Sequence, residues 1–262
     1  MKCLSPMSIA RPNGSGAKDR ITIPCGICFA CLAKKRAEWF FRLKNELKDH
    51  TSALFVTLTY SDEKIPKQNG LYTVRKKDCQ DFLKRLRDRI KPRKIRYYLV
   101  SEYGTETLRP HYHAIIFNMD LDDLAIIDKA WQFGHISIVS VTDASMNYVC
   151  KYVINKQVVI KGVEKVFSIM SLRPAIGKTY LELNEQYHIE NSIFYGTLEG
   201  GKKVSLPRYY RDKIFSKFDK EANNLYMQML EDQAIARDME KHWDYFAQDL
   251  NKKIQFTEKQ LS

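Results

Sequence analysis

The chain has 262 residues, enough for one large domain or a core domain with additions, and a core of that size needs no disulfide scaffold. Lysine and arginine outnumber aspartate and glutamate by 43 to 31, and the resulting formal charge of +12 suits a polyanionic partner such as nucleic acid. There is no apolar run of about 18 residues for a membrane span, and residues 1–12 lack the apolar stretch of a signal peptide, so we expect a cytosolic protein whose six cysteines stay reduced.

Four of the cysteines lie near the N-terminus. Cys25, Cys28 and Cys31 are spaced three residues apart, and Cys3 precedes them across a loop with Gly and Ser at 12–18. Four thiolates suit a tetrahedral zinc site in which Cys25 and Cys28 form the knuckle. The spacing is not that of a standard zinc finger. Unligated cysteines at a helix start therefore stay an alternative, and iron–sulfur ligation is a third.

The next segments alternate between helical and strand patterns. Residues 29–49 carry apolar side chains at helical spacing among lysines and arginines, which predicts a basic, amphipathic helix. Residues 53–60 are apolar and β-branched and predict a central strand. After the turn signal Asn69-Gly70, helical spacing predicts a second helix over 74–90, which Lys91-Pro92 ends.

Two strands with a short connection follow, over 95–102 and 111–117, and predict an antiparallel hairpin. A helix over 120–131 and a strand over 134–141 come next. The order is thus strand, helix, strand, strand, helix, strand. This is the ferredoxin-like order, so we expect an α+β fold with an antiparallel sheet covered on one face by two helices.

The hairpin carries the first candidate site. His111 and His113 are two residues apart in a strand and therefore share a face. Glu102 ends the preceding strand and is expected close to His111. Two imidazoles and a carboxylate are suitable ligands for a divalent metal that keeps open positions for substrate. The alternative is a surface strand with two solvated histidines.

A second candidate feature lies on the helix that follows the last of these strands. Thr142 or Asp143 is expected to cap it. Tyr148 and Tyr152 are four residues apart and so share one helix face. Lys151 lies about 100° from that face. Without other evidence, two tyrosines that pack in a core explain the pattern equally.

The remainder is less regular. Residues 158–169 predict one or two short strands, 171–177 a loop, and 220–250 a long, polar helix. Residues 196–202 have the spacing of a phosphate-binding loop, but Lys203 replaces the required Ser or Thr, so we interpret them as a glycine turn between strands. Residues 208–211 form a basic, aromatic patch. We divide the chain into a Cys-rich segment 1–50, a core 51–157 and a C-terminal extension 158–262.

Three segments in this order resemble the HUH endonucleases that initiate rolling-circle DNA replication. They are the strand at 55–59, the His111-Tyr112-His113 strand, and the helix with Tyr148 and Tyr152. Two tyrosines four apart are typical of the branch that includes the initiators of small single-stranded DNA phages. Residues 25–31, 101–104 and 109–113 look most like those of microviruses, specifically the gokushovirus group. The resemblance covers residues 1–177 and is weak beyond them.

The resemblance implies a site-specific endonuclease and ligase that nicks the viral origin. Tyr148 or Tyr152 would attack the phosphate and form a 5′-phosphotyrosine, which keeps the phosphodiester energy for rejoining. His111, His113 and Glu102 would hold Mg²⁺ or Mn²⁺.

The same resemblance implies single-stranded DNA at the origin as the substrate. Lys151 or Lys156 would stabilise the tyrosine phenolate, and Arg109, Lys156 and Arg208 would contact DNA. Because the sequence has no credible ATPase motif, a host helicase and polymerase are expected partners, in the host cytoplasm.

Two other interpretations stay open. A zinc-containing DNA-binding regulator that cuts nothing explains the charge and the cysteines, but leaves the histidines and tyrosines as coincidence. A transposase or conjugative relaxase would use the same chemistry, although the Cys-rich N-terminus and the short length disfavour it.

Overall fold

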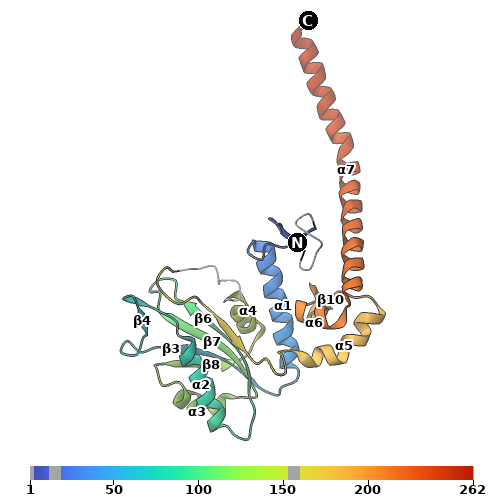
Figure 1. Ribbon diagram of the computed structural model, residues 1–262. Helices are drawn as coiled ribbons and strands as arrows, with labels where there is room; N and C mark the ends of the chain where they lie inside the picture. The colour runs from blue at the N-terminus through green and yellow to red at the C-terminus, as the bar shows by residue number, and fades with distance from the viewer. Residues whose placement is uncertain (1–2, 12–18, 153–159, 262) are drawn as a thin grey trace. The chain divides into compact units, whose positions relative to one another are not determined.

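The computed structural model describes residues 3–11, 19–152 and 160–261 (Figure 1). The chain divides into two compact units, Met1–Tyr210 and Arg211–Ser262. The first unit contains the central sheet and its helices, and the second contains the long helix α7 (Lys217–Leu261). Within the described part of the chain, no helix combines the length and the apolar character that crossing a membrane requires.

The central sheet has the ferredoxin-like arrangement expected from the sequence. Its strands lie in the order β8-β3-β7-β6-β9, and every neighbouring pair is antiparallel. The main elements follow the predicted chain order β3, α2, β6, β7, α3, β8, which confirms the α+β fold. The strand bounds are β3 Ala53–Thr59, β6 Arg96–Tyr103, β7 Pro110–Phe117, β8 Ile136–Ser140 and β9 Ser168–Met170.

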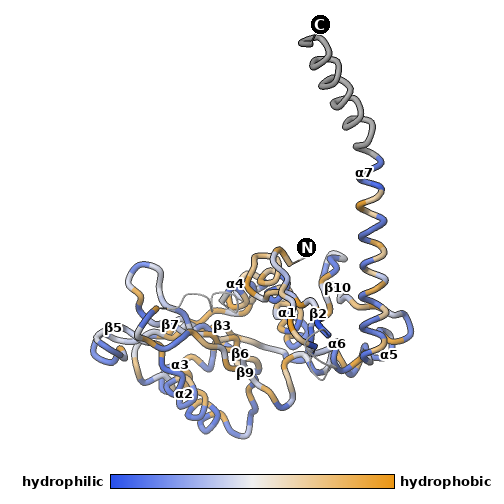
Figure 2. Tube along the Cα trace, turned by 45° about the horizontal axis from the view of Figure 1, so that its top comes forward, coloured by the Kyte–Doolittle hydropathy of each residue, from blue (hydrophilic) through white to orange (hydrophobic). Residues whose placement is uncertain are grey.

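One face of the sheet packs against α2 (Lys76–Arg89) and α3 (Leu124–Ala130), as expected. Alternate residues of β3 supply this face, and Leu54, Val56 and Leu58 are all buried. Phe82 of α2 and Trp131 after α3 pack there with perpendicular rings. The strands are correspondingly hydrophobic in Figure 2.

The opposite face of the sheet is covered as well, by α1 (Phe29–Leu47) and α4 (Asp143–Tyr152). Leu43 of α1 and Val149 of α4 are buried in this second core together with Ile115 of β7. The predicted fold specified helices on one face only, so α1 and α4 add a layer to it. Figure 1 shows α2 and α3 on one side of the sheet and α1 and α4 on the other.

Local signals explain where the helix that follows β8 begins. The N–H of Ser145 donates to Oγ1 of Thr142 at 3.2 Å, so Thr142 is the capping residue that the sequence suggested. The helix then runs through Tyr148 and continues to Tyr152. Its N-terminus is thereby fixed at the edge of the sheet next to β8.

A buried carboxylate ties α1 to the sheet. Glu46 forms an ion pair with Arg96 at the start of β6, and it accepts a hydrogen bond from the N–H of Gly177 at 2.5 Å. His50 lies 3.1 Å from the same carboxylate. Burial raises the pKa of Glu46, but the hydrogen bonds from Arg96, Gly177 and His50 outweigh it, so the net pKa is lowered.

Smaller elements complete the chain. The glycine turn expected near 196–202 is confirmed, since it joins the paired strands β10 and β11. Two more hairpins, β1–β2 and β4–β5, and helix α5 were not expected from the sequence. The bounds are β1 Met7–Ala10, β2 Arg20–Ile23, β4 Lys67–Gln68, β5 Leu71–Tyr72, α5 Lys178–Glu190, β10 Tyr195–Thr197, β11 Lys203–Ser205 and α6 Arg208–Ile214.

Candidate functional site

The hairpin β6–β7 aligns the three predicted metal ligands. In its register Glu102 is directly opposite His111, which in turn pairs with Thr59 on the neighbouring strand β3. His113 lies two residues further along β7 and pairs with Thr57. Both histidines belong to the sheet face that α4 covers, because the intervening Tyr112 is buried in the core on the other face.

The imidazole of His113 is held on both of its nitrogens. Oγ1 of Thr57 lies 3.1 Å from Nδ1, and a carboxylate oxygen of Glu102 lies 3.0 Å from Nε2. The residue is only 6% exposed, so water competes little for these hydrogen bonds. The orientation of the ring is therefore fixed by two side chains from neighbouring strands.

His111 is half-buried beside this pair. Burial and the neighbouring His113 lower the pKa of His111, which favours the neutral imidazole that a metal ligand requires. Gly104 lies against the ring, and a Cβ at that position would come within 3.2 Å of Cε1 of His111. Glycine at 104 thus leaves room for the imidazole.

Tyr148 reaches the same place from α4. Its ring centroid lies 5.0 Å from that of His113, and the two planes are perpendicular. Phe55 of β3 stacks on His113 at 5.7 Å and meets Tyr148 edge-on at 6.1 Å. Tyr148 is 40% exposed, so part of its side chain stays open to a substrate. The structure thus brings one predicted tyrosine into contact with a predicted metal ligand.

The other predicted site residues lie in different surroundings. Tyr152 follows one turn after Tyr148 in the backbone of α4, but its side chain and all of Lys156 lie outside the described residues. Lys151 is exposed on α4. Arg109 bonds Asp62 at 2.6 Å and the carbonyl oxygen of Tyr60 at 2.9 Å.

Arg208, the last predicted DNA contact, is exposed at the start of α6. It lies just before Tyr209, whose ring is covered by the guanidinium of Arg42 at 4.7 Å, and before the buried Tyr210. The aromatic part of the patch at 208–211 therefore packs largely within the protein. Arg208 itself faces solvent.

The donors at the histidine site fit a divalent ion. Two neighbouring ligands of an octahedral ion, each about 2.1 Å from it, lie about 3 Å apart, which is the separation of His113 Nε2 and Glu102 Oε2. Thr57 supports the ring from its other nitrogen, as partners behind a ligating histidine commonly do. His111 would complete the set from the adjacent position of β7.

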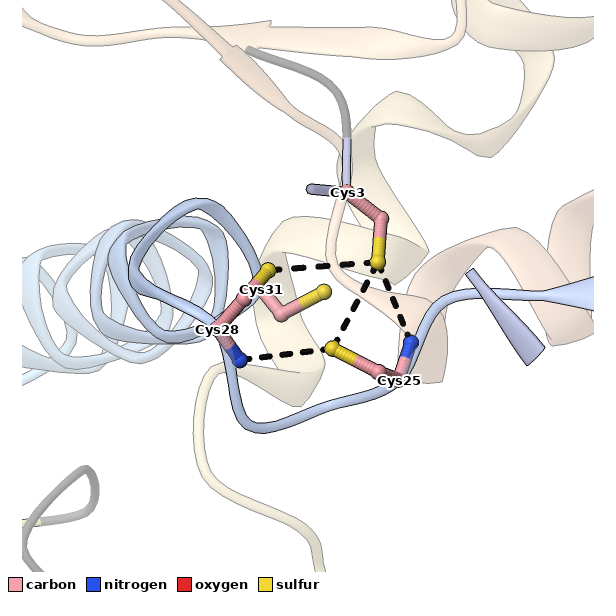
Figure 3. Close-up of side chains that lie close together, drawn as sticks. All are labelled: Cys3, Cys25, Cys28 and Cys31. Atoms are coloured by element: carbon pink, nitrogen blue, oxygen red, sulfur yellow. Dashed lines mark hydrogen bonds between the residues drawn. The ribbon is translucent and has the colours of Figure 1, made fainter. Parts of the chain in front are cut away.

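The four N-terminal cysteines form a second group, at the start of α1 (Figure 3). Their sulfur atoms all lie within 4.8 Å of one another, with Cys3 at 3.5 Å from Cys25 and 3.8 Å from Cys28. In the described part of the chain, this is the one set of three or more potential ligands so closely grouped. The four thiols are therefore placed to hold a metal ion.

One thiol of this group is prepared for ligation. The N–H of Leu4 donates to the sulfur of Cys28, and together with the N–H of Cys31 it lowers the pKa of Cys28 to about 6. A thiolate is the form that binds metal. The spacing of Cys25, Cys28 and Cys31 predicted this group, and the fold brings Cys3 to it from the other side of the β1–β2 hairpin.

Sequence reasoning missed three residues that shape the histidine site: Phe55, Thr57 and Gly104. Phe55 and Thr57 alternate with the buried residues of β3, so the two-residue period of that strand places them on the face of the histidines. That period was visible in the sequence. The identity of the strand paired with β7 was not.

Comparison with known proteins gives the same outline. Residues 53–157 match the family model described as replication-associated protein ORF2. The chain is 32% identical to the replication-associated protein ORF2 of Spiroplasma virus 4 over 212 residues, 72% of this chain and 66% of that protein. It is 30% identical to the replication-associated protein VP4 of Bdellovibrio phage phiMH2K over 215 residues, again 72% of this chain and 66% of the relative.

A third relative is more distant. The replication-associated protein ORF4 of Chlamydia phage 1 is 24% identical over 218 residues, 73% of this chain and 53% of that protein. The chain thus spans just under two thirds of the length of the first two relatives and about half of the third. No solved structure matches the chain. The family match begins at β3 and ends just beyond α4, so it contains the whole histidine site.

Proposed function

The chain belongs, over residues 53–157, to the replication-associated protein ORF2 family, and on that premise we propose that it initiates rolling-circle replication of a small single-stranded DNA phage. Its reaction is the nicking and rejoining of single-stranded DNA at the viral origin by tyrosine attack. The observation that supports this most directly is the contact of Tyr148 with His113, which is itself bonded to Glu102.

The reaction exchanges one phosphodiester for another. The phenol oxygen of Tyr148 attacks the scissile phosphorus, a P–O bond to tyrosine forms, and the bond to the 3′ oxygen breaks. The tyrosine proton is released and the 3′ oxygen leaves as a hydroxyl, which leaves the 5′ end on the protein. Because the bond energy is kept in the phosphotyrosine, attack by a 3′ hydroxyl reverses the step and joins DNA.

His111, His113 and Glu102 are the proposed ligands of Mg²⁺ or Mn²⁺. When bound there, the ion supplies positive charge that polarises the scissile phosphate and offsets the charge developing on it. Thr57 and Glu102 hold His113, and the rings of Phe55 and Tyr148 shield it from water. The protein thus orients the ligands before DNA arrives, which is where electrostatic catalysis gains most.

Lys151 is the proposed cation near the nucleophile. A tyrosine hydroxyl titrates near pKa 10, so a positive charge nearby lowers the cost of forming the phenolate. Lys151 is three residues after Tyr148 in α4, and residues three apart are neighbours on a helix surface. Tyr152 is the proposed second nucleophile, one turn further on, and would cut the completed origin while Tyr148 holds the first 5′ end.

The proposed substrate is single-stranded DNA, contacted also by Arg109, Lys156 and Arg208. A host helicase and polymerase are proposed partners, because the initiator itself would only nick and join. For the cysteine group we propose structural zinc. Zinc bound by four thiolates about 2.3 Å away separates the sulfurs by about 3.8 Å, and two of the distances here are 3.5 and 3.8 Å.

The test is formation of a covalent protein–DNA adduct. The purified protein is incubated with Mn²⁺ and labelled single-stranded oligonucleotides that tile the replicon encoding it. Wild type should give an adduct that survives denaturation, and the double variant Tyr148→Phe with Tyr152→Phe should give none. Tyr187→Phe, which alters an exposed tyrosine of α5, is the control and should react normally. A folded wild-type protein without adduct, or a double variant that keeps it, would contradict the proposal.

A further inference from the structure

A large cavity in the first unit lies beside the tyrosine helix and outside the histidine site. Its volume is about 690 Å³. One face of α1, one face of α4 and the connection between β10 and β11 line it. Phe29, Leu32 and Phe40 of α1, with Leu198 and Val204 opposite, make its apolar surface.

An exposed aromatic ring stands in this lining. Phe29 is 69% exposed, although it is the first residue of a helix and directly follows Cys28 of the cysteine group. Leaving a phenyl ring in water gives up the stabilisation that burial would bring. Burial therefore does not explain the ring in this structure, and an aromatic face open to solvent is the surface on which nucleobases stack.

The charges around the cavity favour an anion. Arg36, Lys44, Lys151 and Lys202 contribute four positive charges, against two carboxylates. Both carboxylates are bound by the same lysine, since Lys44 lies 3.0 Å from Asp143 and 3.1 Å from Glu199. The other three cations, Arg36, Lys151 and Lys202, thus give the cavity its net positive charge. Apolar walls with a cationic rim suit a ligand that has both aromatic rings and phosphates.

The cavity is adjacent to the proposed nucleophile. Asp143, Asn147 and Lys151 line it from α4, and residues spaced by four lie along one helix face. Tyr148 follows Asn147 directly, so it projects about 100° further around the same helix, toward His113. A strand whose phosphate lies at Tyr148 therefore reaches the cavity by passing around one helix.

From these observations we propose that the cavity binds nucleotides of the single-stranded DNA that flank the cleaved phosphate. Bases stack on Phe29 and Phe40, and phosphates lie against Arg36, Lys151 and Lys202. A volume of about 690 Å³ falls within the roughly 300–1,000 Å³ of small-molecule sites, which is sufficient for one or two nucleotides. This inference rests on the proposed function and adds to it the surface that holds the strand beside the nick.

The experiment separates DNA binding from chemistry. Binding is measured by fluorescence anisotropy with a labelled oligomer of about 12 thymidines, a length within the range of known single-strand sites. The test variants are Phe29→Ala and Lys202→Glu. Both residues are exposed, so the variants should fold. The controls are Leu172→Ala and Lys94→Glu, which alter exposed residues near the Arg96 end of β6, the end opposite Glu102.

Each test variant should raise the Kd for the thymidine oligomer at least about fivefold, as the loss of one base stack or phosphate contact predicts. The controls should bind as wild type does. Adduct formation by the variants at saturating oligonucleotide from the replicon should approach the wild-type yield. Wild-type affinity in Phe29→Ala and Lys202→Glu, or an equal loss in the controls, would overturn the inference even when wild type forms the adduct. Failure of the proposed function itself would instead show as wild-type protein that forms no adduct.

Discussion

Replacing Thr57 by valine tests whether the hydroxyl behind His113 positions this ligand. Valine has nearly the same shape and keeps strand β3 intact, but it removes the group 3.1 Å from Nδ1. A lost hydrogen bond costs about 1 kcal/mol, and a buried nitrogen left without a partner costs roughly 1–3 kcal/mol. We therefore expect a modest loss of stability. Loss of such a supporting partner also lowers metal affinity or activity by about 10–100-fold.

The assay is the rate of adduct formation as a function of Mn²⁺ concentration, with urea unfolding in parallel. Thr57→Val should need about tenfold more Mn²⁺ or more for half-maximal rate, and saturating Mn²⁺ should restore most of the rate because His113 is still present. The matched control is Thr59→Val in the same strand, whose hydroxyl bonds the carbonyl oxygen of His135 at 3.1 Å. An unchanged Mn²⁺ dependence in Thr57→Val, or the same shift in the control, would refute the reasoning.

Three further predictions concern stability and the cysteine group. Because the pKa of Glu46 is lowered in the folded protein, its stabilising effect is complete above the unfolded value of about 4.3 and is lost as pH falls below it. Glu46→Gln should thus unfold at a lower temperature than wild type at neutral pH, with a difference that narrows in acid; parallel curves would exclude this role. Cys25→Ser should purify with less zinc by atomic emission, and equal zinc in both proteins would contradict a four-thiolate site. Gly134→Ala should lose about 1–3 kcal/mol in urea unfolding, since a Cβ there would lie 2.3 Å from the backbone nitrogen of Ser61; unchanged stability would show that the backbone relaxes freely.

The elements that build the site were predictable because their side-chain periods are local. Leu54, Val56 and Leu58 repeat every second residue and identify a strand buried on one face. The short connection before Pro110 predicted the hairpin that sets Glu102 opposite His111. Strand pairing then fixes which side chains meet.

The remaining features depend on contacts between distant segments, which periodicity does not encode. Glu46 and Arg96 are 50 residues apart, and Thr57 and His113 are 56 residues apart. Nor did any local pattern show that α1 and α4 cover the second sheet face, although that packing brings Tyr148 to His113. Strand β9 likewise joins the sheet from outside the predicted core.

The cysteine group illustrates an intermediate case. The spacing of Cys25, Cys28 and Cys31 is local and predicted a metal group, whereas the position of Cys3 depends on the β1–β2 hairpin. That hairpin is formed by two short, largely exposed strands with little apolar pattern. Its absence from the predicted elements has this physical reason.

The most direct test of the central claim is to locate the DNA on the protein. The adduct formed with origin oligonucleotide and Mn²⁺ is digested with nuclease and protease, and the modified peptide is sequenced by tandem mass spectrometry. We predict a nucleotide attached through its 5′ phosphate to Tyr148, or to Tyr152 on the same helix. Attachment to a residue outside α4, or an adduct through a 3′ phosphate, would contradict the account.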